Sequence, residues 1–407
     1  MTQQAEAVAE TRYRVFDGDN HYYETYDSFT RYMDPAYADF AINVQRAENG
    51  RNYVMVGNER LRSNPAHPQD FIGRPESILE MFRDPNADIG MAEFNAKNRM
   101  RAEELPDSID VGERLAFMDR EGIDAAMLYP SLAVMVEQQL SGNVGASFAN
   151  LHAFNRWLEE DWGYATEGRL FSVPLLSLLD VDLAVQELDR VLKLGARAVH
   201  LRTGPVFGRS PASEHFDPFW SRLNEARVPV AFHSSFSQYH QLWSVQWGEE
   251  GDPTYSQITP FQSYLGTGAR PMMDTMAALT LHGLFTRFPN INVLAVEGGS
   301  FWVADLLRQM DKGYQSGRGS KLAPRLHDLP SEILKQHLYV TPFPEEDVTK
   351  LAEVLPTRNI ILGSDYPHPE GLAHPASYAE KIEPVLGREA TRGVMGENLA
   401  RVIGIWN

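Results

Sequence analysis

Ionisable side chains stand at the ends of several short apolar runs in this 407-residue sequence. The sequence contains no cysteine, so any bound metal must be held by histidine, aspartate or glutamate. The four strongest candidates for metal ligands are Asp19, His21, His233 and Asp365. Two imidazoles and two carboxylates make an N₂O₂ donor set that suits Zn²⁺, Fe²⁺ or Mn²⁺. These residue types therefore favour a catalytic metal site with positions left open for water.

The stretch 359–371 (NIILGSDYPHPEG) places two chemical groups where an apolar run ends. Asp365 and His368 come after the run 360–363, which breaks at Pro367. A short apolar run that ends at proline is typical of a buried strand, and parallel folds carry their chemistry at the carboxyl ends of strands. We expect Asp365 to be the general base, with Glu297 and His368 as further catalytic candidates. The alternative is that Asp365 caps a turn and that His368 is a surface loop residue.

Eight apolar runs, nearly all separated by helical patterns, would position these groups. The runs lie at 13–18, 123–129, 170–176, 198–202, 228–233, 291–297, 337–341 and 360–363. Eight parallel βα units predict an α/β fold, a (β/α)₈ TIM barrel, in which the strand ends converge on one mouth. A doubly wound open sheet is the alternative, but the sequence lacks the G-x-G-x-x-G turn typical of that fold.

Long segments with breaker residues interrupt this alternation twice. We expect insertions after the first and fifth strands, at about 22–106 and 234–270, within a single domain at 13–407. The polar stretch 1–12 is expected to be a disordered tail without signal-peptide character. No apolar run approaches the ~20 residues of a membrane helix. The net charge of −18 argues against a nucleic-acid partner. We therefore expect a soluble cytoplasmic protein that acts on a small molecule.

Several motifs are similar to those of a known family. They are D-x-D-x-H-x-x-E at 17–24, V-P-V-A-F-H at 228–233 and G-S-D-Y-P-H at 363–368, supported by G-L-F-T-R-F-P at 283–289 and E-G-G-S-F-W at 297–302. With these motifs the chain resembles the amidohydrolase superfamily. The resemblance is to the amidohydrolase-2 branch, which includes aminocarboxymuconate-semialdehyde decarboxylase and resorcylate-type decarboxylases.

The resemblance implies one divalent metal held by Asp19, His21, His233 and Asp365. Zinc is expected, with manganese or iron as alternatives. Asp19 stands where the family commonly has histidine, although some of its decarboxylases also have an acidic residue there. Glu297 stands where its decarboxylases usually place a histidine that acts in proton transfer. The resemblance also implies a homo-oligomer, which we expect to be a dimer.

Three functions are compatible with these residues. We rank a metal-dependent hydrolase first, in which a metal-activated water attacks a small, aromatic or carboxylate-bearing substrate, because this chemistry needs no histidine at the sixth strand. A metal-dependent non-oxidative decarboxylase of a hydroxyaromatic or unsaturated acid is the alternative. A third possibility is a metal-free binding protein, in which Asp19 is a degraded ligand.

Three residues are candidates for contact with the substrate. Arg202 ends the fourth predicted strand, and its guanidinium matches a carboxylate in shape. Trp243, in the second insertion, and Tyr366, beside Asp365, suggest a flat or hydrophobic substrate. The alternative is that such aromatic rings form the core of the loops or a dimer contact.

Overall fold

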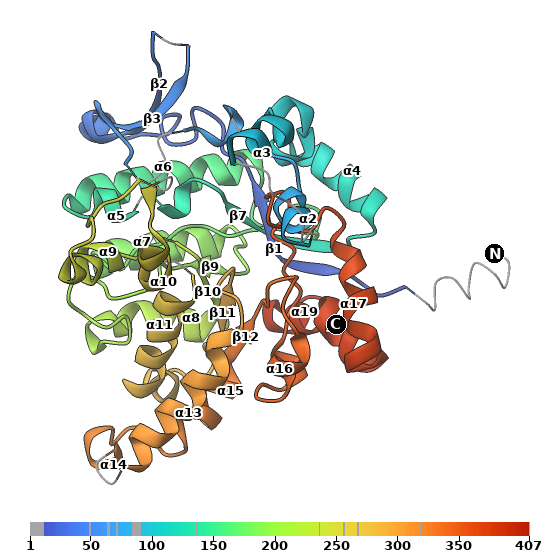
Figure 1. Ribbon diagram of the computed structural model, residues 1–407. Coiled ribbons are helices and arrows are strands. Elements are labelled where there is room, and N and C mark those ends of the chain that lie inside the picture. The colour runs from blue at the N-terminus through green and yellow to red at the C-terminus, as the bar shows by residue number, and fades with distance from the viewer. Residues whose placement is uncertain are drawn as a thin grey trace, which may run out of the picture.

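The structure of the chain is a computed structural model. It describes residues 12–48, 50–62, 66–70, 72–83, 91–135, 137–235, 237–254, 257–266, 268–316 and 319–406. Strands lie at the centre of the molecule and helices surround them (Figure 1). The tail expected at 1–12 lies outside the described residues, apart from Arg12.

Two parallel sheets make up the central ring. Their seven strands are β1 (Phe16–Tyr22), β7 (Ala125–Pro130), β8 (Leu170–Ser172), β9 (Val199–His200), β10 (Val230–His233), β11 (Val293–Val296) and β12 (Leu338–Val340). One sheet has the order β1-β7-β8 and the other β12-β11-β10-β9. A parallel bridge from Leu175 to His200 joins the two sheets on one side.

The segment 360–363 closes the ring on the other side. A parallel bridge pairs Ile360 with Val340 of β12, and the N–H of Gly18 in β1 donates to the carbonyl of Leu362 at 2.8 Å. Eight parallel segments therefore follow one another around the barrel, as the sequence predicts. One boundary was wrong. The first strand begins at Phe16 and runs through Tyr22, so Asp19 and His21 lie within it and not after it.

Helices cover the outside of the barrel. The larger ones are α4 (Val111–Glu121), α6 (Val144–Asp161), α7 (Val181–Lys193), α8 (Asp217–Ala226), α11 (Ala269–Leu281), α13 (Phe301–Gln315), α15 (Pro330–His337) and α17 (Tyr378–Leu386). The shorter ones are α2 (Ser77–Arg83), α3 (Met91–Asn98), α5 (Glu137–Leu140), α9 (Tyr239–Leu242), α10 (Pro260–Gly266), α12 (Leu284–Arg287), α14 (Gly319–Leu322), α16 (Val348–Ala352), α18 (Arg388–Arg392) and α19 (Asn398–Ile403).

Local sequence sets the helix ends. Helix α4 begins at Asp110, whose side chain accepts from the N–H of Glu113, and stops at Gly122 with a φ of 71°. A cap of this kind satisfies an N–H that the helix itself cannot pair, and glycine adopts the left-handed stop without a steric penalty.

Two apolar layers hold the barrel together. Inward-facing side chains fill its interior, among them Phe16, Met127, Phe171 and Leu294, and α19 packs against the same cluster. A larger cluster lies between the strands and the surrounding helices. Because successive residues of a strand face opposite sides, inward positions near the carboxyl ends of the strands open toward the mouth.

The insertion after β1 contains more regular structure than the loop with short helices that the sequence suggested. Strands β2 (Ile42–Arg46), β3 (Asn52–Val56) and β4 (Glu59–Arg60) form an antiparallel sheet, and β5 (Ile72–Gly73) pairs with β6 (Arg99–Met100). In β3 the apolar residues Val54, Met55 and Val56 follow one another, so the alternation that identifies a hairpin is weak in the sequence. Among the described residues, no helix is long and apolar enough to cross a membrane.

Candidate metal centre

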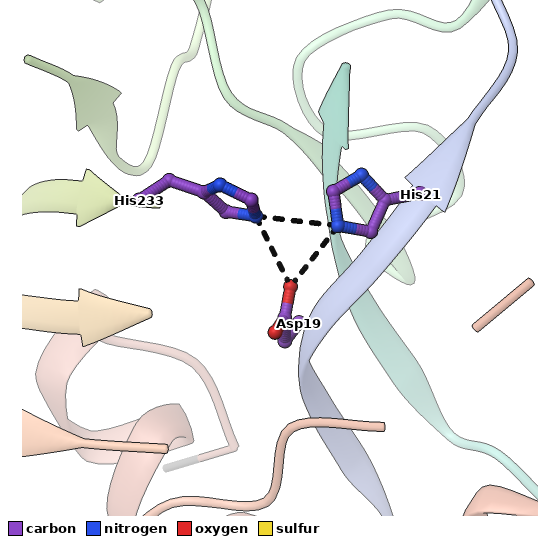
Figure 2. A group of neighbouring side chains, drawn as sticks. All are labelled: Asp19, His21 and His233. Carbon is purple, nitrogen blue, oxygen red and sulfur yellow. Dashed lines mark hydrogen bonds and ion pairs between the residues drawn. The ribbon is translucent and has the colours of Figure 1, made fainter. Parts of the chain in front are cut away.

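Asp19, His21 and His233 bring three donor atoms together at the mouth of the barrel (Figure 2). The Nε2 atoms of the two histidines lie 3.2 Å apart. The Oδ1 atom of Asp19 lies 3.3 Å from Nε2 of His21 and 3.5 Å from Nε2 of His233. All three side chains are buried, and they come from β1 and β10. The structure thus brings together residues that are more than 200 positions apart in the sequence.

The spacing and the hydrogen bonds of these donors fit a divalent metal. Around a metal with bonds of about 2.1 Å, tetrahedral ligand atoms lie about 3.4 Å apart. Nδ1 of His233 lies 2.9 Å from the carbonyl of Ser234 and donates to it, so Nε2 is the nitrogen that faces the other donors. Although burial opposes the shift, the charges of Glu297 and Asp19 raise the pKa of His233, so a bound metal would displace a proton from Nε2. Oδ1 of Asp19 has no hydrogen-bond partner among the described residues. Burial lowers the pKa of His21 to about 3, so its ring is neutral and able to bind a cation.

Asp365 and Glu297 add two carboxyl groups to the same centre. Oδ1 of Asp365 lies 3.4 Å from Nε2 of His21, and Oε2 of Glu297 lies 3.0 Å from Nε2 of His233. Both acidic residues have a left-handed backbone, with φ values of 57° and 53°. This conformation costs a residue other than glycine about 1–3 kcal/mol, and such strain occurs most often at functional sites. Its presence at both acids supports a functional role for the pair.

Crowding changes the protonation of these carboxyl groups. Burial raises the pKa of Asp365 well above its ordinary range, and the charges of Glu370 and Asp19 act in the same direction. Burial also raises the pKa of Glu297, although nearby His233 opposes the effect. A divalent cation at the centre would relieve the repulsion among these groups. The donor set therefore fits either a bound metal or carboxyl groups that retain protons.

His368 contacts Asp365 directly. Its Nδ1 lies 2.7 Å from Oδ1 of Asp365, and its Nε2 lies 2.9 Å from the hydroxyl of Ser131. That hydroxyl donates to the carbonyl of Tyr22, so it can accept a hydrogen bond from the Nε2–H of His368. The His368 ring also lies against the ring of His21, with centroids 4.1 Å apart. The arrangement orients His368 and Asp365 relative to each other.

Asp17 connects the two strands that carry the ligands. Its carboxylate accepts from the N–H and the hydroxyl of Ser364, from the side-chain amide of Asn20 at 2.8 Å and from the N–H of Asp19. The N–H of Asp365 in turn donates to the carbonyl of Asp19 at 2.8 Å. The quoted motif 17–24 contained Asp17, but sequence reasoning gave it no role.

Arg114 is a positioning residue that sequence reasoning missed. It is fully buried on α4 and donates to the carbonyl of His21 at 2.7 Å, to the side chain of Asn20 and to the carbonyl of Asp107. The guanidinium therefore holds the backbone next to a metal ligand. In the sequence, Arg114 looks like an ordinary polar residue of an amphipathic helix, so no signal pointed to it.

Glu24 is the last residue of the motif at 17–24, and its side chain bonds the loop that follows Ser131. One of its oxygens accepts from the N–H groups of Leu132 and Ala133, both at 2.8 Å. Its other oxygen has no partner among the described residues. Burial raises the pKa of Glu24 to about 7, although the two N–H groups oppose the shift.

Replacing Glu24 with glutamine should change how stability depends on pH. Because the folded-state pKa lies above that of the unfolded chain, Glu24 favours folding most below about pH 4.5, and this contribution is lost as the pH rises to about 7. Between these limits, the free energy of unfolding of the wild type should fall by about 3 kcal/mol relative to Glu24→Gln. Urea unfolding at several pH values measures the difference. Parallel pH profiles of the two proteins would contradict the assignment.

The three predicted substrate contacts differ in their surroundings. Arg202 is buried near the mouth, with Nε 3.8 Å from Oε2 of Glu137. Trp243 is 53% exposed, on the segment between α9 and the following 3₁₀ turn. The hydroxyl of Tyr366 donates to Asp107 at 2.7 Å and its ring stacks on Phe117, so its side chain is occupied in packing. The three roles stay predictions.

Comparison with known proteins adds independent findings. A family model described as amidohydrolase matches residues 66–405, a stretch that begins after β1 and so excludes Asp19 and His21. An amidohydrolase from Mycobacterium avium subsp. paratuberculosis K-10 is 33% identical, with a TM-score of 0.86 over 96% of this chain and 99% of that chain. No curated protein sequence matches the chain.

Two decarboxylases share the fold at lower identity. The 5-carboxyvanillate decarboxylase of Sphingomonas paucimobilis is 17% identical, with a TM-score of 0.58 over 97% of this chain and 99% of that chain. A dihydroxybenzoic acid decarboxylase from Polaromonas sp. JS666, whose structure contains manganese and 2-nitroresorcinol, is also 17% identical. Its TM-score is 0.54 over 72% of this chain and 85% of that chain. At this identity the likeness is one of fold.

Proposed function

Since the chain belongs to the amidohydrolase family, we propose that it is a metal-dependent non-oxidative decarboxylase of a small hydroxyaromatic or unsaturated carboxylic acid. This reverses the order in which the sequence ranked the two reactions. The hydrolase came first because Glu297 replaces a histidine that acts in proton transfer in the family's decarboxylases. In the structure, Glu297 reaches the metal ligands and has a raised pKa, so it offers a proton-holding group at that position.

The observation that carries the proposal is the pair of carboxyl groups of Glu297 and Asp365, which both have a left-handed backbone and lie beside the predicted metal ligands. Decarboxylation needs an acid that delivers a proton to carbon, whereas hydrolysis needs a base that takes a proton from water. The raised pKa values of Glu297 and Asp365 favour the role of an acid. Two decarboxylases of hydroxyaromatic acids with the same fold support the same reaction class.

Asp19, His21 and His233 would hold the metal, and Asp365, which the sequence also predicted as a ligand, would keep its proton beside it. When bound, the cation would supply positive charge for the carboxylate of the substrate and a neighbouring oxygen. Among the metals that the sequence allowed, manganese gains support beside zinc because a structure of the same fold contains it. We also propose that the protein is a cytoplasmic homodimer.

The acids of the site then perform the proton transfer. Asp365 delivers its proton to the carbon that bears the carboxylate, the bond from that carbon to the carboxylate breaks, and its electron pair returns to the substrate. The carboxylate leaves as CO₂, and the carbon keeps the proton. His368, 2.7 Å from Asp365 and 17% exposed, returns a proton from solvent to Asp365, and Glu297 holds a second proton near the substrate. One proton is consumed for each CO₂ released.

A panel assay tests the proposal. The protein is stripped of metal, reloaded with Mn²⁺ or Zn²⁺ and incubated with hydroxybenzoates, including 2,6-dihydroxybenzoate and 5-carboxyvanillate, while CO₂ is measured. We expect CO₂ from at least one acid, and only from the metal-loaded protein. The hydrolase is the second candidate, because Asp19, His21 and His233 would leave positions on the metal open for water and the 33% identical neighbour is named an amidohydrolase. Amides, esters and lactones are tested in parallel. Cleavage of any of them, without CO₂ from any acid, would favour the hydrolase.

A further inference from the structure

Arg202 is a buried cation with unused hydrogen-bond donors near the metal centre. Its side chain is 5% exposed, and Nη2 donates to the carbonyl of Pro205 at 3.1 Å. Nε and Nη1 have no hydrogen-bond partner among the described residues. Ala231 pairs with His200, so Arg202 and His233 each come two residues after a paired residue, on neighbouring parallel segments. Neighbouring strands lie about 5 Å apart, so the guanidinium starts one strand away from a metal ligand.

Glu137 is the counter-ion of Arg202, but the pair is loosely formed. Its Oε1 accepts from the hydroxyl of Ser177 at 2.8 Å, while its Oε2 remains 3.8 Å from Nε of Arg202. A structural arginine–carboxylate pair usually forms two parallel hydrogen bonds of about 2.7–2.9 Å. Here Glu137 balances part of the charge of Arg202 without using its donors. A buried donor without a partner costs about 1–3 kcal/mol, so a ligand that satisfies it gains affinity.

Further unpaired polar groups lie on the same two strands and their loops. Nε2 of His200 is buried and has no partner among the described residues, and its pKa is lowered by burial and by the charges of His233 and Arg202. The loop after β10 packs on the loop after β9, where a Cβ at Gly204 would lie 3.0 Å from the carbonyl of Ser237. The hydroxyl of Ser237 is also buried and unpaired within the described part of the chain. Arg202, His200 and Ser237 therefore all have buried polar atoms without partners among the described residues.

We propose that Arg202 binds a second anionic group of the substrate, a carboxylate, while the first carboxylate lies at the metal centre, and that Glu137 limits the strength of this contact. The substrate is accordingly a rigid dicarboxylate. This inference rests on the proposed function, since it concerns the same site. Arg202 is the receptor of the second carboxylate, and Glu137 is a resident negative charge that repels it. The two residues should therefore affect dicarboxylate binding in opposite directions.

Calorimetry on the metal-loaded protein tests this with benzoate as the monocarboxylate and phthalate, isophthalate and terephthalate as dicarboxylates. We expect at least one dicarboxylate to bind the wild type about tenfold more tightly than benzoate. Arg202→Gln should abolish this advantage without changing the affinity for benzoate, whereas Glu137→Gln should enlarge it. Arg202→Lys, which keeps the charge beside Glu137, should retain part of it. Circular dichroism and metal content serve as controls for folding.

A purely structural ion pair would give a different pattern. Both glutamine variants would then lower stability and weaken benzoate and dicarboxylate binding alike, and that result would overturn the inference, as would a wild type without any preference for a dicarboxylate. The readout is binding and not turnover. A dicarboxylate preference without CO₂ release would therefore refute the proposed reaction alone, and CO₂ release without the preference would refute this inference alone.

Discussion

Asp365→Asn is expected to lower kcat by about 10³-fold, because it removes the acid that protonates the substrate carbon. Asparagine has nearly the same shape, and the N–H of residue 365 still donates to the carbonyl of Asp19. The fold should survive for that reason. The strained backbone of Asp365 and its contacts with His21 and His368 support a role for its carboxyl group beyond capping a turn.

Because Asp365 is also a predicted metal ligand, the metal content of the variant must be measured together with its kcat. The variant is assayed at saturating Mn²⁺, and bound metal is counted by mass spectrometry. Asp347→Asn is the matched control, since Asp347 caps the exposed start of α16, away from the site. A folded, metal-loaded Asp365→Asn protein with the kcat of the wild type would show that Asp365 is not the acid.

His233→Ala should nearly abolish metal binding. The imidazole supplies a lone pair fixed by the hydrogen bond to Ser234, and it lies within 3.5 Å of donor atoms from Asp19, His21 and Glu297. Loss of a partner that merely orients a ligand costs about 10–100-fold in affinity, so loss of the ligand itself should cost at least about 10²-fold. Titration of the stripped protein with Mn²⁺ and Zn²⁺ measures the change.

His337→Ala is the matched control for this variant. His337 is also buried, but it bonds the carbonyl of Ile291 and stacks on Phe285, so its loss should leave metal affinity unchanged. If His233→Ala bound metal as tightly as the wild type, the metal centre would have to lie elsewhere. A wild-type protein that takes up neither metal would instead favour the metal-free binding protein.

The sequence predicted the barrel and the convergence of Asp19, His21, His233 and Asp365 because both depend on local patterns. Short apolar runs identify strands, and the barrel topology then brings distant strand ends to one mouth. The roles of Asp17 and Arg114 were not predictable in the same way. Their partners, such as Ser364 and the carbonyl of His21, are fixed by tertiary contacts that leave no periodic signal in the sequence.

The proposed reaction depends on a feature that the sequence did not reveal. Glu297 appeared in the sequence as a missing histidine, whereas its proposed role depends on its left-handed backbone and on its carboxyl group, which lies 3.0 Å from Nε2 of His233. The hairpin in the first insertion was missed for a related reason, since the run of apolar residues in β3 hides the alternation of a strand. At Glu297 and at the hairpin, the structure depends on tertiary contacts that the residue types alone do not reveal.

The isotopic fate of the solvent tests the central claim most directly. The metal-loaded protein turns over its acid substrate in D₂O enriched in ¹⁸O, and the organic product is examined by mass spectrometry and NMR. A decarboxylase that protonates carbon through Asp365 predicts one deuterium at the carbon that lost CO₂ and no ¹⁸O in the organic product. An organic product that retains its carboxylate and carries ¹⁸O from the solvent would contradict the account and establish hydrolysis instead.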